Sequence, residues 1–254
     1  MTDTKPFDGK LALVTGASRG IGAATAEALA AAGAHVILTA RTAQSLEQVE
    51  ERIHDAGGTA TIAPMDLTDS ENIKKLAQAA AERWGSLDIL VLNAAMLGSL
   101  SPVEHLDPKE LDRVFKLNVH ANQALIAAFD PLLRRAEKAD VIGITSSVGS
   151  EPRAFWGGYG ASKAAFDTML GAYADETAHA GKLRVQIVDP ARPARGCASS
   201  PSPVRNRKAS RGRKSSPPRS SSGCRATRKP EAAAASTRPV RSAVRAGRCR
   251  LRPA

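Results

Sequence analysis

Thr15-Gly-Ala-Ser-Arg-Gly-Ile-Gly22 carries three glycines between an apolar run and an alanine-rich segment. The apolar run Leu11–Val14 before it is typical of a strand buried on both faces of a parallel sheet, and the alanine-rich segment after it predicts a helix. Gly16, Gly20 and Gly22 allow a tight turn and a close approach of the backbone to a ligand, and the first turn of the helix offers its amide groups to a pyrophosphate. Because the glycines lie between a strand and a helix, the pattern favours a phosphate-binding turn over a ligand-free turn.

The next strand is predicted at 34–39, and Arg41 follows it. Dinucleotide sites that prefer NAD usually place an acid about 20 residues after the glycines, where it binds the ribose 2′-hydroxyl, whereas an arginine suits a 2′-phosphate. Arg19 lies inside the glycine turn, so two cations could flank that phosphate. The sequence therefore favours NADP(H), with NAD(H) as the alternative cofactor. The competing interpretation of Arg41 is a solvated residue at the start of a helix.

Four further apolar runs predict strands, and the segments between them predict helices. Six strands that alternate with helices predict an α/β fold: a doubly wound parallel sheet of the Rossmann type, with helices on both faces in three α/β/α layers. In such a sheet a ligand binds at the carboxyl ends of the strands. Several polar or conformationally special residues follow these predicted ends, namely Arg41, Asp66, Asn93, Ser146 and Pro190.

Three of the residues near this edge carry specific expectations. Asp66 can meet an adenine amino group or, equally, cap a turn. Asn93 starts the small-residue stretch Asn93-Ala94-Ala95, which leaves room for a ribose or nicotinamide, and its side chain can hydrogen-bond neighbouring strands. Asn118 lies among apolar neighbours in a helix that we predict to begin at Asp107 or Pro108, so its amide needs a buried partner.

A hydroxyl, a phenol and an ammonium recur between Ser146 and Lys163 at spacings that suit carbonyl chemistry. Tyr159 and Lys163 are four residues apart, so on a helix they lie on the same face. The cation would favour the phenolate and lower the tyrosine pKa from its ordinary value of about 10. On spacing alone such a pair is more often an amphipathic surface pair. The nucleotide-binding pattern upstream favours the catalytic interpretation.

These motifs together resemble those of the short-chain dehydrogenase/reductase family over about residues 9 to 190. They are Thr-Gly-x-x-x-Gly-x-Gly, Asn-Ala-Ala in place of the family's usual Asn-Ala-Gly, a helical asparagine, and a serine thirteen residues before Tyr-x-x-x-Lys. The resemblance implies an enzyme that transfers hydride between NAD(P)H and a small-molecule carbonyl or alcohol. It also implies a homo-oligomer, because the family usually forms dimers or tetramers.

The resemblance implies a role for each matched residue. Tyr159 would be the proton donor or acceptor, and Lys163 would hold the nicotinamide ribose and depress the tyrosine pKa. Ser146 would orient the substrate oxygen, and Asn118 would support a water relay. No metal is expected. The residues expected to bind the cofactor are Gly16, Ser18, Arg19, Gly20, Ile21, Gly22, Arg41, Asp66, Leu67, Asn93, Ala94, Tyr159, Lys163 and Pro190.

The composition changes abruptly after Pro190. The last 64 residues carry 18 Lys and Arg against one acid, whereas the first 190 carry 18 against 24 acids, so the net charge of +11 describes this tail. With no aromatic, no isoleucine and four Leu or Val residues, 191–254 is predicted to be a disordered Arg/Ser/Pro-rich tail. Residues 1–190 would then be a truncated NAD(P)-binding domain that lacks the family's substrate-covering loop, last strand and last helix.

Out-of-frame translation would explain this break. With permitted codons, one G inserted after the Pro190 codon restores the family's Pro-Gly-x-Thr pattern and an amphipathic helix. If the tail is genuine, its charge indicates sequence-blind nucleic-acid binding, although it has no aromatic residues to stack on bases and we expect no nucleic-acid partner. A further alternative is a nucleotide-binding remnant without turnover.

The remaining expectations concern location and the substrate pocket. All three cysteines lie in the tail, so the first 190 residues cannot form a disulfide, which indicates a reduced, cytoplasmic protein. The N-terminus has no apolar signal core, and no membrane partner is expected. Phe155 and Trp156 indicate either an apolar wall of the substrate pocket or a subunit interface.

Overall fold

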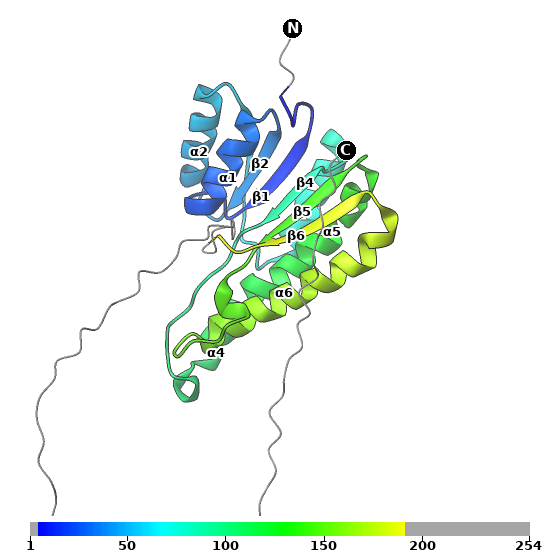
Figure 1. Ribbon diagram of the computed structural model, residues 1–254. Helices are drawn as coiled ribbons and strands as arrows, with labels where there is room; N and C mark the ends of the chain where they lie inside the picture. Colours follow the sequence, from blue (N-terminus) through cyan, green and yellow to red (C-terminus); the bar gives the residue numbers. More distant parts are fainter. Residues whose placement is uncertain (1–4, 191–254) are drawn as a thin grey trace, which may run out of the picture. The chain divides into compact units, whose positions relative to one another are not determined.

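The computed structural model describes residues 5–190, and within them six strands form one parallel sheet (Figure 1). The strand order is β3-β2-β1-β4-β5-β6, so the direction of winding reverses between β1 and β4. This arrangement confirms the predicted α/β fold with a doubly wound parallel sheet. The strands are β1 (Leu11–Thr15), β2 (His35–Ala40), β3 (Thr59–Pro64), β4 (Ile89–Leu92), β5 (Ala139–Ile144) and β6 (Leu183–Val188).

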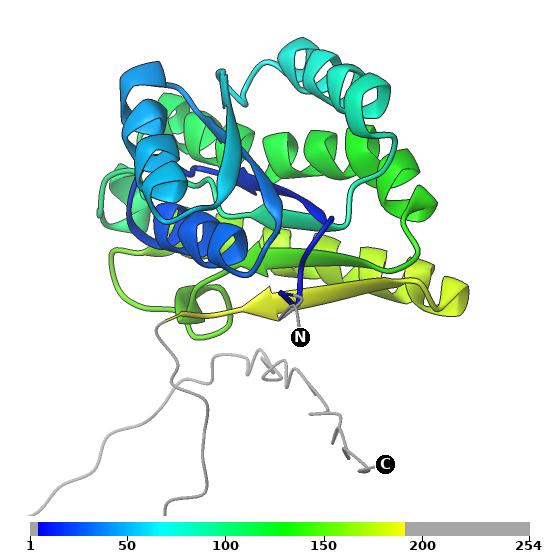
Figure 2. The same ribbon diagram turned by 90° about the horizontal axis from the view of Figure 1, so that it is seen from above.

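Helices cover both faces of the sheet (Figure 2). On one face α1 and α2 pack over β1, β2 and β3, and on the other face α3, α5 and α6 pack against the sheet. The three-layer Rossmann architecture is therefore confirmed. The helices are α1 (Gly20–Ala31), α2 (Ala43–Asp55), α3 (Ser70–Trp84), α4 (Pro108–Phe115), α5 (Ala121–Arg135) and α6 (Gly157–Thr177).

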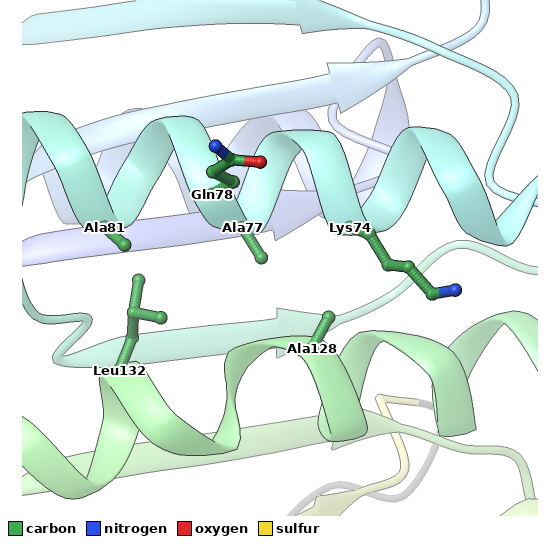
Figure 3. Close-up of a pocket in the computed structure, with 6 residues that line it drawn as sticks. All are labelled: Lys74, Ala77, Gln78, Ala81, Ala128 and Leu132. Carbon is green, nitrogen blue, oxygen red and sulfur yellow. The ribbon is translucent and has the colours of Figure 1, made fainter.

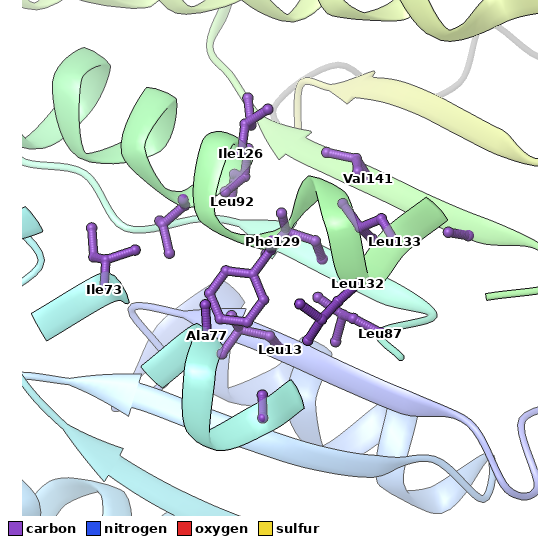
Figure 4. Close-up of a cluster of buried hydrophobic side chains, with 14 of the residues drawn as sticks. Leu13, Ile73, Ala77, Leu87, Leu92, Ile126, Phe129, Leu132, Leu133 and Val141 are labelled. Carbon is purple, nitrogen blue, oxygen red and sulfur yellow. The ribbon is translucent and has the colours of Figure 1, made fainter. Parts of the chain in front are cut away.

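Alternate residues of the central strands feed two separate apolar cores. In β1, Leu11 and Leu13 point to the face with α3, α5 and α6, while Ala12 and Val14 point to the face with α1 and α2. The core on the face with α3, α5 and α6 is the larger of the two, and Phe129 lies fully buried within it (Figure 4). Strands that are buried on both faces consist of continuous apolar residues, which explains the uninterrupted apolar run Leu11–Val14.

The predicted long helix after Asp107 is interrupted. Asp107 caps the start of α4 by accepting a hydrogen bond from the Lys109 backbone amide at 3.1 Å, but α4 ends at Phe115. A π-helical turn, Lys116–His120, follows and leads into α5. Such single turns occur mostly within α-helices and often at functional sites. This one contains Asn118, whose side chain it directs into the interior.

A shallow hollow of about 250 Å³ lies between α3 and α5 (Figure 3). Four of the six side chains that line it are apolar, three of them alanine, and none is a predicted site residue. We therefore attribute the hollow to the packing of alanine-rich helix faces. Its lining residues are Lys74, Ala77, Gln78, Ala81, Ala128 and Leu132.

Candidate functional site

The glycine turn between β1 and α1 is built for close backbone packing. Gly16 and Gly20 have φ values of +66° and +57°, which favour glycine. A β-carbon on Gly22 would collide with the Gly16 carbonyl and the Asn93 side-chain amide. Arg19 precedes α1 without capping it through its side chain, so the first-turn amides are open to an anion. The turn thus has the shape that phosphate binding requires.

Asn93 locks this turn to the neighbouring strand. Its Nδ2 donates to the carbonyl oxygens of Thr15 at 2.9 Å and Gly16 at 3.2 Å. In return, the Thr15 hydroxyl accepts from the backbone amides of Asn93 and Ala94 at 2.9 and 3.1 Å and donates to the Val91 carbonyl. The expectation that Asn93 bonds a neighbouring strand is confirmed. These bonds fix the edge where the sheet reverses its winding, the place where α/β sheets bind ligands.

The two arginines that were expected near a 2′-phosphate, Arg19 and Arg41, are both solvent-exposed. Asp66 Oδ1 accepts a hydrogen bond of 2.8 Å from the Thr68 backbone amide, and this bond lowers the pKa of the Asp66 carboxyl, with a smaller effect from Arg41. Of the two interpretations of Asp66, turn capping is therefore observed here. The Leu67 side chain is buried in the larger apolar core, so it stabilises the segment after β3 by packing.

Tyr159 and Lys163 lie one turn apart on α6, as predicted. Lys163 is 4% exposed, and its ammonium lies 5.9 Å from the Tyr159 ring centroid and donates a hydrogen bond of 2.7 Å to the Ile144 carbonyl at the end of β5. Burial lowers the pKa of Lys163 to about 8. The pKa of Tyr159 is raised by burial and by the charge of Asp189. The expected lowering of this pKa is therefore not seen, because burial and then the Asp189 charge raise it.

Ser146 lies after the end of β5, close to the part of α6 that carries Tyr159 and Lys163. It follows β5 and precedes a short 3₁₀ turn, Ser147–Gly149, that packs directly against α6. A β-carbon on Gly149 would lie 3.2 Å from Lys163 Cβ, so the serine turn and the Tyr-Lys helix approach closely. Pro190, the last described residue, follows β6 at the same edge of the sheet.

Asn118 is fully buried and its side chain is saturated with partners. Its Oδ1 accepts from the Met96 backbone amide at 2.8 Å, and its Nδ2 donates to the Met96 carbonyl and the Ser162 hydroxyl, both at 2.9 Å. The Ser162 hydroxyl donates in turn to the Tyr159 carbonyl at 2.7 Å. The expected buried partner of Asn118 is therefore found. Ser162 was not predicted, and the one signal for it was a small polar residue between Tyr159 and Lys163.

Two loops meet beside Tyr159. The Ser101 backbone amide donates to the Phe155 carbonyl at 3.1 Å and so joins the loop after β4 to the loop before α6. Phe155 is 56% exposed with a φ of +71°, and Trp156 contacts the Tyr159 ring edge-on with centroids 6.2 Å apart. Both interpretations of these aromatics, a pocket wall or a subunit interface, fit an exposed Phe155.

The described part of the chain contains neither a metal site nor a membrane-spanning helix. Within residues 5–190, no group of three His, Cys, Asp or Glu side chains is placed to hold a metal ion. No helix in the described range is long and apolar enough to cross a membrane. The predicted tail, the frame hypothesis and the proposed nucleic-acid contact fall outside the described residues.

A glycine turn at the reversal point of a parallel sheet, with a Tyr-Lys pair beside it, defines a dinucleotide-binding α/β protein with a candidate catalytic site. A family model described as short chain dehydrogenase matches residues 10–194. The chain therefore belongs to the short-chain dehydrogenase family and is an NAD(P)-dependent oxidoreductase by that membership. The family match ends four residues beyond Pro190, close to the break in composition.

Individual relatives agree with this assignment. The uncharacterized oxidoreductase YciK of Escherichia coli is 37% identical over 184 residues, which cover 71% of this chain and 72% of YciK. A metagenomic short-chain oxidoreductase, solved in complex with NADP, has a TM-score of 0.69 and 37% identity over 73% of this chain and 84% of its own. A short chain dehydrogenase from Escherichia coli CFT073, solved with NADPH, has a TM-score of 0.70 and 36% identity over 74% of this chain and 78% of its own.

Proposed function

We propose that this chain uses NADP(H) to interconvert a carbonyl and an alcohol on a small-molecule substrate. The observation that carries the proposal is the buried Lys163 beside Tyr159 at the edge that also holds the glycine turn. The turn fits a dinucleotide, because Gly22 leaves no room for a side chain and the first-turn amides of α1 are open. The bound nicotinamide would supply or accept the hydride.

The residues of the chain would handle the proton and the orientation. A raised pKa keeps the Tyr159 phenol protonated at neutral pH, which suits it to donate a proton to a carbonyl oxygen during reduction. Ser146 would orient that oxygen, and Lys163 would hold the nicotinamide ribose. Asn118 would fix the backbone of Tyr159 through Ser162 and support a water relay.

The preference for NADP(H) rests on Arg41 and Arg19. Both residues are exposed, Arg19 within the glycine turn and Arg41 directly after β2, and Arg41 is close enough to Asp66 to influence its carboxyl. Three of the structural relatives were solved in complex with NADP or NADPH. The remaining cofactor contacts are proposed as in the sequence-based set: Gly16, Ser18, Gly20, Ile21, Gly22, Asp66, Leu67, Asn93, Ala94 and Pro190.

Titration of the full chain with NADPH and NADH, followed by cofactor fluorescence, tests this proposal. Arg41→Ala should weaken NADPH binding about tenfold, because a hydrogen bond to a charged group contributes roughly 1.5–3 kcal/mol, and should leave NADH binding unchanged. Arg52→Ala is the matched control, since Arg52 is an exposed arginine that pairs with Glu27 on α1. Equal loss for both cofactors, or none, would contradict the 2′-phosphate assignment.

A second candidate, a nucleotide-binding chain without turnover, is favoured by the composition break after Pro190. We propose residues 1–190 as the NAD(P)-binding domain and 191–254 as a separate, out-of-frame tail. Saturable NADPH binding without reduction of a panel of aldehydes and ketones would support this candidate over the enzyme. Sequencing the gene across the Pro190 codon tests the frame hypothesis, which fails if the base count matches that of an intact relative.

Oligomeric state and location complete the proposal. We propose a homo-oligomer, by resemblance to the family, and a cytoplasmic location, because the first 190 residues contain no cysteine. Sedimentation at several protein concentrations measures the first, and a monomer at all of them would refute it. Fractionation of the source cells measures the second.

A further inference from the structure

Asp167 lies one helical turn beyond Lys163 on α6, and both side chains meet the end of β5. Lys163 donates to the Ile144 carbonyl, and Asp167 lies beside Thr145, the next residue. Asp167 Oδ1 and the Thr145 hydroxyl oxygen are both buried. Neither atom makes a well-directed hydrogen bond within residues 5–190. The Thr145 hydroxyl nevertheless lies near enough to lower the pKa of the Asp167 carboxyl. Neither residue belongs to the motifs that identify the family here.

A third element, β6, lies beside the end of β5. The Thr145 backbone amide donates to the Val188 carbonyl at 2.9 Å, which brings Asp189 next to the end of β5 and the first half of α6. Asp189 acts electrostatically on both Tyr159 and Asp167. Of the titratable groups in the described chain, Tyr159 and Asp167 on α6 therefore lie by the Lys163 ammonium, while Asp189 after β6 acts on Tyr159 and on Asp167.

The ammonium needs an anion because little water reaches it. Lys163 is 4% exposed, and its other neighbours are the Ile144 carbonyl and the rings of Tyr159 and Phe166, which lie 5.9 and 5.1 Å from Nζ. These groups are uncharged when the tyrosine is protonated. A buried amine without a counter-charge tends to lose its proton.

We propose that Asp167 is a positioning residue whose carboxylate, one helical turn away, keeps Lys163 protonated where its ammonium binds the end of β5, beside Tyr159. This inference rests on the proposed function for its relevance to catalysis. The carboxylate would act through Lys163 and would touch neither substrate nor cofactor.

The electrostatic balance at this corner supports the proposal. Burial lowers the pKa of Lys163 to about 8, and Asp167 is the charge that opposes this effect. Burial raises the pKa of the Asp167 carboxyl and Asp189 raises it further, while Thr145 and Lys163 lower it. Removal of the Asp167 charge should therefore move the pKa of Lys163 below 8, so that the amine loses its proton within the neutral range.

The test measures the protonation of Lys163 directly and needs no turnover. The full chain is labelled with acetic anhydride from pH 6 to 10, and the fraction labelled at Lys163 is quantified by peptide mass spectrometry. Asp167→Asn should shift the midpoint for Lys163 downward by about one pH unit, the scale expected for loss of a nearby opposite charge. Asp175→Asn, an exposed acid two turns further along α6, should leave it unchanged.

Two additional measurements keep the outcome decisive. Asp167→Glu keeps the charge and should hold the midpoint near that of the unchanged chain. In the unchanged chain, the carboxyl-carbon resonance of Asp167 should shift a second time near pH 8, as Lys163 titrates, so a poorly folded Asp167→Asn would not end the test. An unshifted midpoint in folded Asp167→Asn, or the absence of that second step, would overturn the proposal. A shifted midpoint in a chain that shows no turnover would leave the proposal standing while the enzymatic function fails.

Discussion

Asn118 Nδ2 lies 2.9 Å from Ser162 Oγ, and this hydrogen bond joins the π-helical turn before α5 to the middle of the Tyr-x-x-x-Lys segment on α6. The same amide holds both backbone groups of Met96 in the loop after β4. One buried side chain thus fixes three segments relative to one another. The position of Tyr159 is therefore coupled to the loop that follows β4.

Asn118→Ala should destabilise the fold by roughly 3 kcal/mol, because it leaves the partly buried Met96 amide and carbonyl and the buried Ser162 hydroxyl without this partner. The free energy of unfolding in urea measures the loss. Asn122→Ala is the matched control, because Asn122 is also buried but makes one recorded bond, of 2.8 Å to the Asn118 carbonyl. A loss in the control as large as that in Asn118→Ala would refute the argument.

Gly22→Ala should abolish NADPH binding, because the added methyl group would collide with the Gly16 carbonyl and the Asn93 amide. Cofactor fluorescence measures binding, and urea unfolding should show a weaker fold. Gly171→Ala on α6 is the contrast, since nothing lies within 4 Å of its added carbon. That change should raise the free energy of unfolding by about 0.5–1 kcal/mol, the usual gain for alanine over glycine in a helix. Unchanged NADPH binding by Gly22→Ala would show that the turn does not hold the pyrophosphate.

Tyr159→Phe should lower kcat by about 10²–10⁴-fold, the range for loss of a general acid, while the Kd for NADPH stays within about twofold. Steady-state assays with a carbonyl substrate and fluorescence titration give the two values. The separation matters because the ring itself packs against Trp156, and phenylalanine preserves that contact. An equal loss of binding and turnover would assign Tyr159 a structural role.

The fold was predictable because its signals are local. Continuous apolar runs mark strands buried on both faces, and the glycines between β1 and α1 mark the turn. The break at Lys116–His120 was missed, because an extra residue in one helical turn leaves the apolar spacing on either side nearly unchanged.

The electrostatics of the site depended on contacts that spacing does not show. The four-residue separation of Tyr159 and Lys163 predicted a cation near the phenol, but it gave no measure of burial, which raises the pKa of Tyr159. Asp167 and Asp189 were not predicted as neighbours, because β6 and α6 meet only in the folded chain. The sequence therefore predicted where the candidate site lies, whereas the direction of the Tyr159 pKa shift came from the three-dimensional structure.

Tyr173→Phe should make the fold less sensitive to alkaline pH. The Tyr173 hydroxyl donates a 2.7 Å hydrogen bond to Asp130 Oδ1, and burial followed by this bond and the Asp130 charge raises the pKa of the phenol. A group whose pKa is raised by folding contributes stability that is present below its ordinary pKa of about 10 and is lost as pH rises through the folded value. The variant should be about 1 kcal/mol less stable at pH 8, because the hydrogen bond is lost. Urea unfolding at pH 8 and pH 11 should then show a smaller drop in the free energy of unfolding for the variant than for the unchanged chain. Equal decreases in the free energy of unfolding of both proteins would mean that Tyr173 does not cause the loss of stability at alkaline pH.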